Sequence, residues 1–256
     1  MNYYLYPLRF LTPVHFGDTS EGGNLETISL TLGSDALFGA CCHEISHDTE
    51  LLHSFIKAIE EQQIVLSSLF PYCIDNDEYK LYVPAPMIQM ESRNVPATSF
   101  DDVKTAIAAH KKIKRIEYIR ASELKQFKEY VESDASQKHM PTFGAKQTSA
   151  QVNMRGEKSL PYYVGNYQFM LHAGLYIIAG FHDDAHRALF EGILEVLGLV
   201  GIGGKRSGGY GKFELVADPI ELAKEGIYSD DSALYTLLHN IQGKVMCISA
   251  CVPTSE

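Results

Sequence analysis

The sequence of 256 residues lacks long apolar runs and lacks a surplus of positive charge. No stretch approaches the ~18 apolar residues that a membrane-spanning helix needs, and the polar start MNYYLYPLRF has no basic region followed by a leucine-rich one. We therefore expect a soluble chain that is neither exported nor membrane-bound. The chain carries 22 basic and 32 acidic residues, a net charge of −10. This balance argues against indiscriminate nucleic-acid binding, which comes mainly from neutralised phosphates.

Cysteine is scarce, and its spacing offers no familiar site. The five cysteines are odd in number, include the adjacent pair Cys41 and Cys42, and form no C-x-x-C. This pattern is typical of reduced thiols, so we predict a cytoplasmic protein.

The charges that are present are unevenly distributed. Residues 104–128 hold eight basic residues against two acidic ones, and residues 41–78 hold eight acidic residues against Lys57 alone. Such polarity favours a protein that binds an anion on one side and another protein elsewhere, although a charged run is also typical of a solvated face.

The first part of the chain predicts strand, helix, strand, strand. Residues 3–10 are mostly β-formers, and Ser34 or Asp35 is a suitable N-cap for a helix over 36–45. A second helix is expected over 50–61, followed by strands over 64–70 and 79–83 with a turn at 75–77. This order corresponds to half of a ferredoxin-like unit.

The last part of the chain repeats that alternation. We expect a strand over 167–180, a helix over 183–199, a strand over 210–216, a helix over 232–240 and a strand over 244–252. The predicted fold class is α+β, with ferredoxin-like halves at 1–84 and 166–256. An insertion at 85–165 separates them and carries the basic segment and a loop rich in glycine, serine and threonine.

A glycine-rich loop, GIGGKRSGGYG, occupies residues 201–211, with five glycines from Gly203 to Gly211. It fits neither a P-loop nor the dinucleotide fingerprint G-x-G-x-x-G, which would need glycine where Arg206 stands. Exposed amides beside Lys205, Arg206 and Lys212 suit a sugar-phosphate backbone, which is bound by N–H donors and cations. A glycine-rich hairpin with solvated cations is the structural alternative.

Five further motifs precede this loop in a fixed order: VHFG (14–17), SDALFGA (34–40), SSLFPY (67–72), YVPAP (82–86) and KKIKRIEYI (111–119). With the loop and the FEL that follows it, they resemble the RAMP superfamily of CRISPR-associated RNA-binding proteins. Within that superfamily the sequence is similar to the type III-A Csm-complex subunit that caps the guide. The resemblance runs from residue 3 to about residue 252. Members of the family usually continue past the strand expected over 244–252. The function of such a tail therefore stays open, whereas the RNA-binding motifs are present in this sequence.

The resemblance implies a non-catalytic RNA-binding scaffold that holds the 5′ tag of a CRISPR RNA. Its implied partners are that RNA, the large polymerase-like signature subunit and the adjacent backbone RAMP subunit, with no cofactor, metal, membrane or small-molecule substrate. Family members grip the tag through the loop after the first strand and through the glycine loop, and a thumb-like hairpin in the insertion reaches the guide. The residues that match these parts, or lie where we expect them, are His15, Phe16, Gly17, Ser34, Lys146, Asn153, Arg155, Gly203, Gly204, Lys205, Arg206, Ser207 and Tyr210.

Phe16 and Tyr210 are candidates for stacking a base, with core packing as the alternative. For Lys146 and Arg155 the alternative is a solvated surface.

Two enzymatic alternatives remain open at this point. HEISH at 43–47 is a literal H-E-x-x-H, and His53 falls where a third zinc ligand would stand, but Glu50 occupies the position that the pattern reserves for glycine. His15 is a candidate general base, because some RAMP relatives cut guide precursors with a histidine. The acid pairs 101–102, 183–184 and 230–231 lie near predicted helix starts, where the helix dipole favours them.

Overall fold

The computed structural model describes residues 1–18, 24–86, 104, 116–127, 141–155, 158–240 and 245–251. The first elements are β1 (Asn2–Phe10), α1 (Ser34–Glu44), α2 (Thr49–Glu60), β2 (Ile64–Leu66), β3 (Phe70–Asp75) and β4 (Glu78–Pro84). The middle of the chain forms β5 (Tyr118–Arg120), the 3-10 helix η2 (Ala121–Gln126), β6 (Gly144–Arg155) and β7 (Lys158–Phe169). The last elements are β8 (Ala173–Phe181), α5 (Asp184–Val200), the 3-10 turn η4 (Arg206–Gly208), β9 (Phe213–Leu215), β10 (Ile220–Glu221) and α6 (Ser229–His239).

Eight strands form one antiparallel sheet in the order β10-β1-β8-β3-β4-β5, with β9 also pairing β1 and β2 also pairing β8. Strands from 1–84 and from 166–256 therefore share a single sheet. Its centre is the long pairing of β1 with β8, which aligns Asn2 with Phe181 and Leu8 with Leu175.

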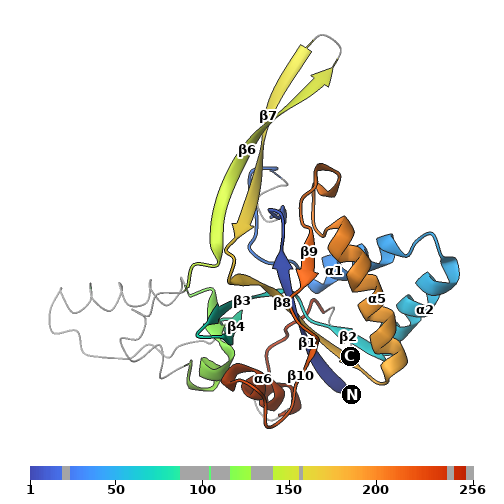
Figure 1. Cartoon of the computed structure of the whole chain (residues 1–256), viewed down its shortest axis with the longest axis vertical. Coiled ribbons are helices and arrows are strands. Elements are labelled where there is room, and N and C mark those ends of the chain that lie inside the picture. Colours follow the sequence, from blue (N-terminus) through green and yellow to red (C-terminus); the bar gives the residue numbers. More distant parts are fainter. Residues whose placement is uncertain are drawn as a thin grey trace.

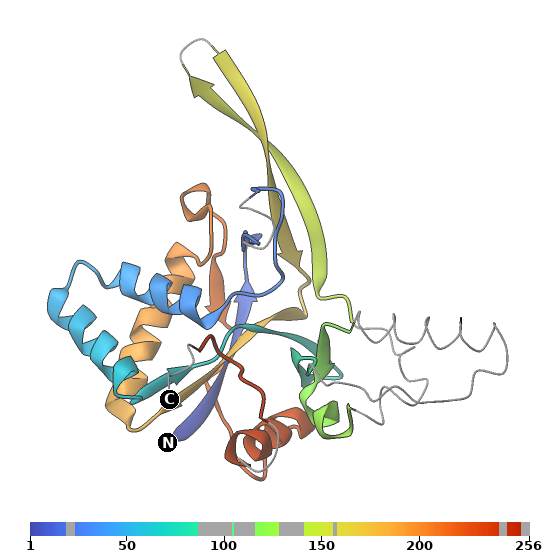
Figure 2. The ribbon, with the colours of Figure 1, turned by 180° about the vertical axis from the view of Figure 1, so that it is seen from behind.

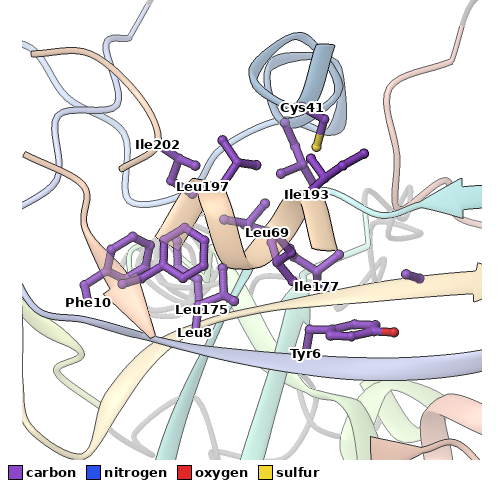
Figure 3. Packing of buried hydrophobic residues seen from close by; sticks show 14 of the residues in the cluster. Tyr6, Leu8, Phe10, Cys41, Leu69, Leu175, Ile177, Ile193, Leu197 and Ile202 are labelled. Carbon is purple, nitrogen blue, oxygen red and sulfur yellow. The ribbon is translucent and has the colours of Figure 1, made fainter. Parts of the chain in front are cut away.

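The sheet is buried on both faces, which explains why all nine residues of β8 are buried. One face packs against α1, α2 and α5, and the residues of this core include Tyr6, Leu8, Leu175, Ile177 and Leu197 (Figure 3). The opposite face packs against α6 and η2 through Leu5, Tyr176, Ile178 and Leu234. Alternate residues of β1 and β8 thus enter different cores, as the two-residue period of a strand requires.

Two strands stand apart from this sheet. β6 and β7 pair along their full lengths, from Gly144 opposite Phe169 to Arg155 opposite Lys158, and the hairpin projects well beyond the body of the molecule (Figures 1 and 2). Strand β6 and residues 158–165 of β7 fall in the predicted insertion, whereas residues 166–169 of β7 fall in the predicted second half. The hairpin continues directly into β8, so its root is fixed to the central sheet.

The α+β class is confirmed, as are the long helices. Helices α2 and α5 lie within one residue of the predicted ranges, and Asp183 is the N-cap of α5, accepting a hydrogen bond from the His186 amide. Asp230 and Asp231 lie in the first turn of α6, as predicted. The division into ferredoxin-like halves at 1–84 and 166–256, joined by an insertion at 85–165, stays a prediction.

Several local predictions are wrong. The strand expected over 64–70 is interrupted after Leu66, the strand expected over 167–180 is interrupted between Phe169 and Ala173, and the glycine-, serine- and threonine-rich loop expected in the insertion forms β6. The N-cap of α1 is Gly33, with no side-chain cap, because the Ser34 hydroxyl accepts instead from the Ala250 amide at 2.8 Å. Residues 245–251 form no strand; they are held by this bond and by the Ser68 amide, which donates to the Ile248 carbonyl. Five of the eight basic residues of the segment 104–128, and the pair 101–102, lie outside the described residues. No helix in the described ranges is both long and apolar enough to cross a bilayer.

Candidate functional site

Two loops from opposite ends of the chain meet beside the sheet. Residues 15–17 follow β1, and the glycine loop connects α5 to β9. Because β9 pairs with the end of β1, with Phe10 opposite Phe213, the loops that extend from these strands lie together. The Gly204 amide donates to the His15 carbonyl, and the Gly211 amide donates to the Pro13 carbonyl, both at 2.8 Å.

The two loops and one face of α1 enclose a hollow of about 400 Å³. The helix contributes Ala36, Gly39, Ala40 and His43, which have the i, i+3, i+4, i+7 spacing of a single helical face. Three of these four residues are small, so the helix forms a wall without filling the space. The rest of the lining is His15, Phe16, Gly17, Leu32, Gly203, Gly204 and Arg206.

The glycines at this site are required by contact between the loops. A Cβ on Gly203 would lie 2.7 Å from Phe16 Cδ1, and a Cβ on Gly204 would lie 2.6 Å from His15 Cδ2. Gly203 also has a φ of +88°, which side-chain-bearing residues rarely adopt. From the sequence, we expected these glycines to allow a ligand to approach the backbone closely. In the structure, the packing of the glycine loop against residues 15 and 16 is sufficient to explain why glycine is needed. The Gly204 amide is already used by His15.

His15 ties this site to the hairpin. Its side chain is 6% exposed, and Nδ1 lies 2.7 Å from the carbonyl oxygen of Gly165 on β7. Since a carbonyl can only accept, Nδ1 is the donor, and in the neutral ring Nε2 is left as an acceptor. His15 therefore connects the first loop, the glycine loop and the hairpin root.

The two cations of the glycine loop have partners inside the molecule. Arg206 Nη1 donates to Glu44 Oε1, the last residue of α1, at 2.5 Å. The Lys205 ammonium lies 5.1 Å from the ring centroid of Tyr162 on β7, a cation-π contact. Lys205 has a φ of +62°, a left-handed conformation that turns the chain into η4. A ligand that binds these cations competes with, or adds to, these contacts.

The other predicted residues fall into three places. Phe16 is 2% exposed and its ring packs edge-on against Phe10, so in this structure it is a core residue. Ser34 is buried at the start of α1, with its hydroxyl bonded to residue 250. Gly17 and Ser207 are exposed, and Tyr210 is partly exposed in the glycine loop.

The predicted hairpin residues are spread along β6. Lys146 lies near the root, where Nζ donates to the Ile28 carbonyl at 3.2 Å. Asn153 is exposed near the tip, and Arg155 is the last residue of β6. These residues are thus separated along the hairpin rather than gathered around the hollow.

The HEISH motif does not have the geometry of a zinc peptidase. Helix α1 ends at Glu44, so His43 and His47 do not occupy successive turns of one helix. Glu44, which would be the general base, pairs with Arg206. In the ranges that the structure describes, no three His, Cys, Asp or Glu side chains are grouped so that they could hold a metal ion.

Sequence reasoning missed the residues that complete the site. Glu44 and Tyr162 hold the two cations, and Ala36, Gly39 and Ala40 open the hollow. The small residues have a helical spacing that could have indicated a helix wall facing a cavity. The two cation contacts join residues far apart in sequence, and no local pattern indicates them.

Comparisons with known proteins bear on the resemblance. No known family profile matches the sequence. A curated relative, "CRISPR system Cms protein Csm4" of Streptococcus thermophilus, is 25% identical over 255 residues, covering 99% of this chain and 74% of the relative. This match along the whole chain confirms the resemblance predicted from the motifs: the chain is similar to a RAMP-like subunit of Csm complexes.

Solved structures overlap with the chain less closely. One chain of "Crystal structure of Csm1-Csm4 cassette in complex with cA4" is 18% identical with a TM-score of 0.49, and the match covers 77% of this chain and 66% of that one. A chain of "Crystal structure of Csm3-Csm4 subcomplex in the type III-A CRISPR-Cas interference complex" is 17% identical with a TM-score of 0.47, covering 88% and 70%. At these TM-scores the overlaps carry no weight for the function of this chain.

Proposed function

We propose that this chain, similar to Csm4 over nearly all of its length, is the RAMP-type subunit of a type III-A Csm complex that holds the 5′ tag of a CRISPR RNA. In this proposal it is a non-catalytic scaffold in antiviral defence. Its neighbours would be the large polymerase-like subunit and the first backbone RAMP subunit, which correspond to Csm1 and Csm3.

The observation that carries the proposal is the hollow. The loop after β1 and the glycine loop, both expected from the sequence to grip the tag, are hydrogen-bonded to each other and line one cavity of about 400 Å³. A second hollow of about 570 Å³ adjoins it, lined by Lys205, Arg206 and Ser207 together with His43, Glu44, Val200 and Gly203. Cations and a hydroxyl beside small residues suit a single strand of RNA, whose phosphates fix its position.

The placement of the hairpin supports the same proposal. The hairpin contacts the site at two levels, through Gly165 near its root and through Tyr162 farther out, so a strand leaving the hollow would pass along β6 and β7. A guide held at its tag would in this way reach the thumb-like element directly.

A binding experiment tests the proposal. Lys205→Ala with Arg206→Ala should weaken binding of an RNA carrying the repeat-derived tag by about tenfold or more at physiological salt, because charge-assisted hydrogen bonds are lost. The slope of log K against log salt should become shallower by roughly 0.7 per phosphate contact removed. Binding is measured by fluorescence anisotropy at several salt concentrations, on tag RNA and on RNA with a scrambled 5′ end.

The matched control is Lys57→Ala with Lys224→Ala, which removes two cations from outside the lining of either hollow. It should leave tag binding within about twofold, and all variants should keep the melting temperature of the parent. Equal loss in both double variants, or no loss in either, would contradict an RNA site at the glycine loop. Recovery of RNA of defined length with the chain, after co-expression with Csm1 and Csm3, tests the assembly that we propose.

A further inference from the structure

Glu44 stands in an unfavourable place for an acid. It is the last residue of α1, where the carbonyl ends of the helix give a partial negative charge and a cation would be favoured. Its carboxylate is only 13% exposed, so it is also partly withdrawn from water. A partly desolvated carboxylate at a helix C-terminus needs a cation, and Arg206 supplies it at 2.5 Å.

The same contact fixes Arg206. Its side chain is 24% exposed, and Nη1 donates to the Glu44 carboxylate. A guanidinium has five N–H donors in one plane, so this bond sets the plane while other donors remain for a second acceptor. Arg206 lines both hollows, and Glu44 lines the larger one, so the pair lies where the two cavities meet.

We propose that Glu44 is a specificity-determining residue that acts through Arg206; this inference rests on the proposed tag-binding function. Glu44 orients the guanidinium so that it binds one phosphate of a strand correctly seated in the hollow. Its negative charge repels phosphates that approach in other positions, which is a repulsive element against the wrong partner. Glu44 thereby lowers the affinity of the site for RNA in general and raises its discrimination between tag RNA and other RNA.

If Glu44 merely supported the site, its removal would weaken RNA binding; this proposal predicts that its removal tightens binding of the wrong RNA. Glu44→Gln should tighten binding of the scrambled RNA about three- to tenfold, with a salt slope steeper by about 0.7, the value for one added phosphate contact. Binding of the tag RNA should change less, because the gain in charge is offset by the loss of orientation. The ratio of the two dissociation constants should therefore fall at least threefold.

Three further variants isolate the mechanism. Glu50→Gln removes the same charge from an exposed residue in the first turn of α2 and should leave the ratio unchanged. Arg206→Lys keeps the charge but loses the planar fork, so it should lower the ratio although the net charge is the same. In an Arg206→Gln background the orienting role of Glu44 is lost and only its repulsion of phosphates remains, so Glu44→Gln should lower the ratio less than it does with Arg206 present.

The outcomes separate this inference from the function on which it rests. If the parent chain binds tag and scrambled RNA equally, the proposed function fails and the role of Glu44 fails with it. If the parent discriminates but Glu44→Gln keeps the full ratio, or Glu50→Gln lowers it equally, the role of Glu44 alone is overturned. Melting temperatures show that each variant is folded, and Arg206→Lys provides an independent test should Glu44→Gln fail to fold.

Discussion

The hollow and the β6–β7 hairpin are held in place by different kinds of contact. The hollow depends on bonds between distant segments, such as Gly204 to His15 and Arg206 to Glu44. The hairpin is held along its length by its own ladder, and its outer part exposes Val152 (59%), Met154 (64%) and Tyr163 (53%). A site built from tertiary contacts is already organised before a ligand arrives, whereas a projecting hairpin with bare apolar residues has the composition of a surface awaiting contact.

Breaking the hollow should cost the most stability. Gly211 has a φ of +78°, and a Cβ there would lie 2.0 Å from the Ile202 carbonyl oxygen. Gly211→Val should lower the free energy of unfolding by about 3 kcal/mol or more, since backbone strain and overlap add. Chemical denaturation measures this loss. Gly208→Ala, where the nearest atom would be 3.6 Å away, is the control and should stay within about 0.5 kcal/mol. Equal effects would show that the loop is not packed as described.

Removing the hydrogen bond between the hollow and the hairpin should have an intermediate effect on stability. His15→Ala removes the donor to the Gly165 carbonyl and should destabilise the chain by about 1–3 kcal/mol, the usual cost of a buried unpaired acceptor. His172→Ala, at an exposed histidine, should have little effect.

The same variant tests the nuclease alternative. If the chain is a scaffold, maturation of the guide in cells that carry His15→Ala should be unchanged, because another protein cuts the precursor. Uncut precursor accumulating in an otherwise assembled complex would favour the alternative.

Changing the outer part of the hairpin should have the smallest effect on stability. Ala150, Val152, Met154, Pro161 and Tyr163 share one face, because opposite residues of an antiparallel pair point the same way. Val152→Ser with Met154→Ser should change the free energy of unfolding by less than about 0.5 kcal/mol. It should nevertheless reduce the yield of assembled complex in co-purification, whereas Gln147→Ser, on the other face, should not. If the double variant loses stability but assembles normally, the outer hairpin is a packed structural element and not a contact surface, which would contradict the comparison with the hollow.

Features that depend on neighbouring residues could be predicted from the sequence, and features that depend on contacts between distant residues could not. The helices α2 and α5 carry their signals locally, in apolar period and in caps such as Asp183. The glycine loop was found because its composition is unusual within eleven residues. The contacts of Glu44 and Tyr162 were not found, because each joins segments separated by more than 40 residues.

Where local and tertiary preferences disagree, the tertiary contact prevails. Phe16 was a candidate for stacking a base. Because Gly203 has no side chain, the Phe16 ring packs against it and is buried in the core. Residues 245–251 have strand-like composition, yet they lie against Ser34 and Ser68 without entering the sheet. Ser34 likewise bonds to that segment instead of capping its helix.

The position of β1 has a consequence for how the chain reaches its fold. β1 precedes every strand that it pairs with: β8, β9 and β10. At roughly 5–20 residues per second of synthesis, the intervening stretch of about 160 residues delays the first of these pairings by roughly 8–30 seconds. During this interval a strand rich in Tyr and Leu has two open edges, the form most prone to pairing with another chain. Such non-local pairing also slows folding itself. The nascent chain is therefore expected to need protection from aggregation until β8 emerges, and to fold more reliably at low expression rates.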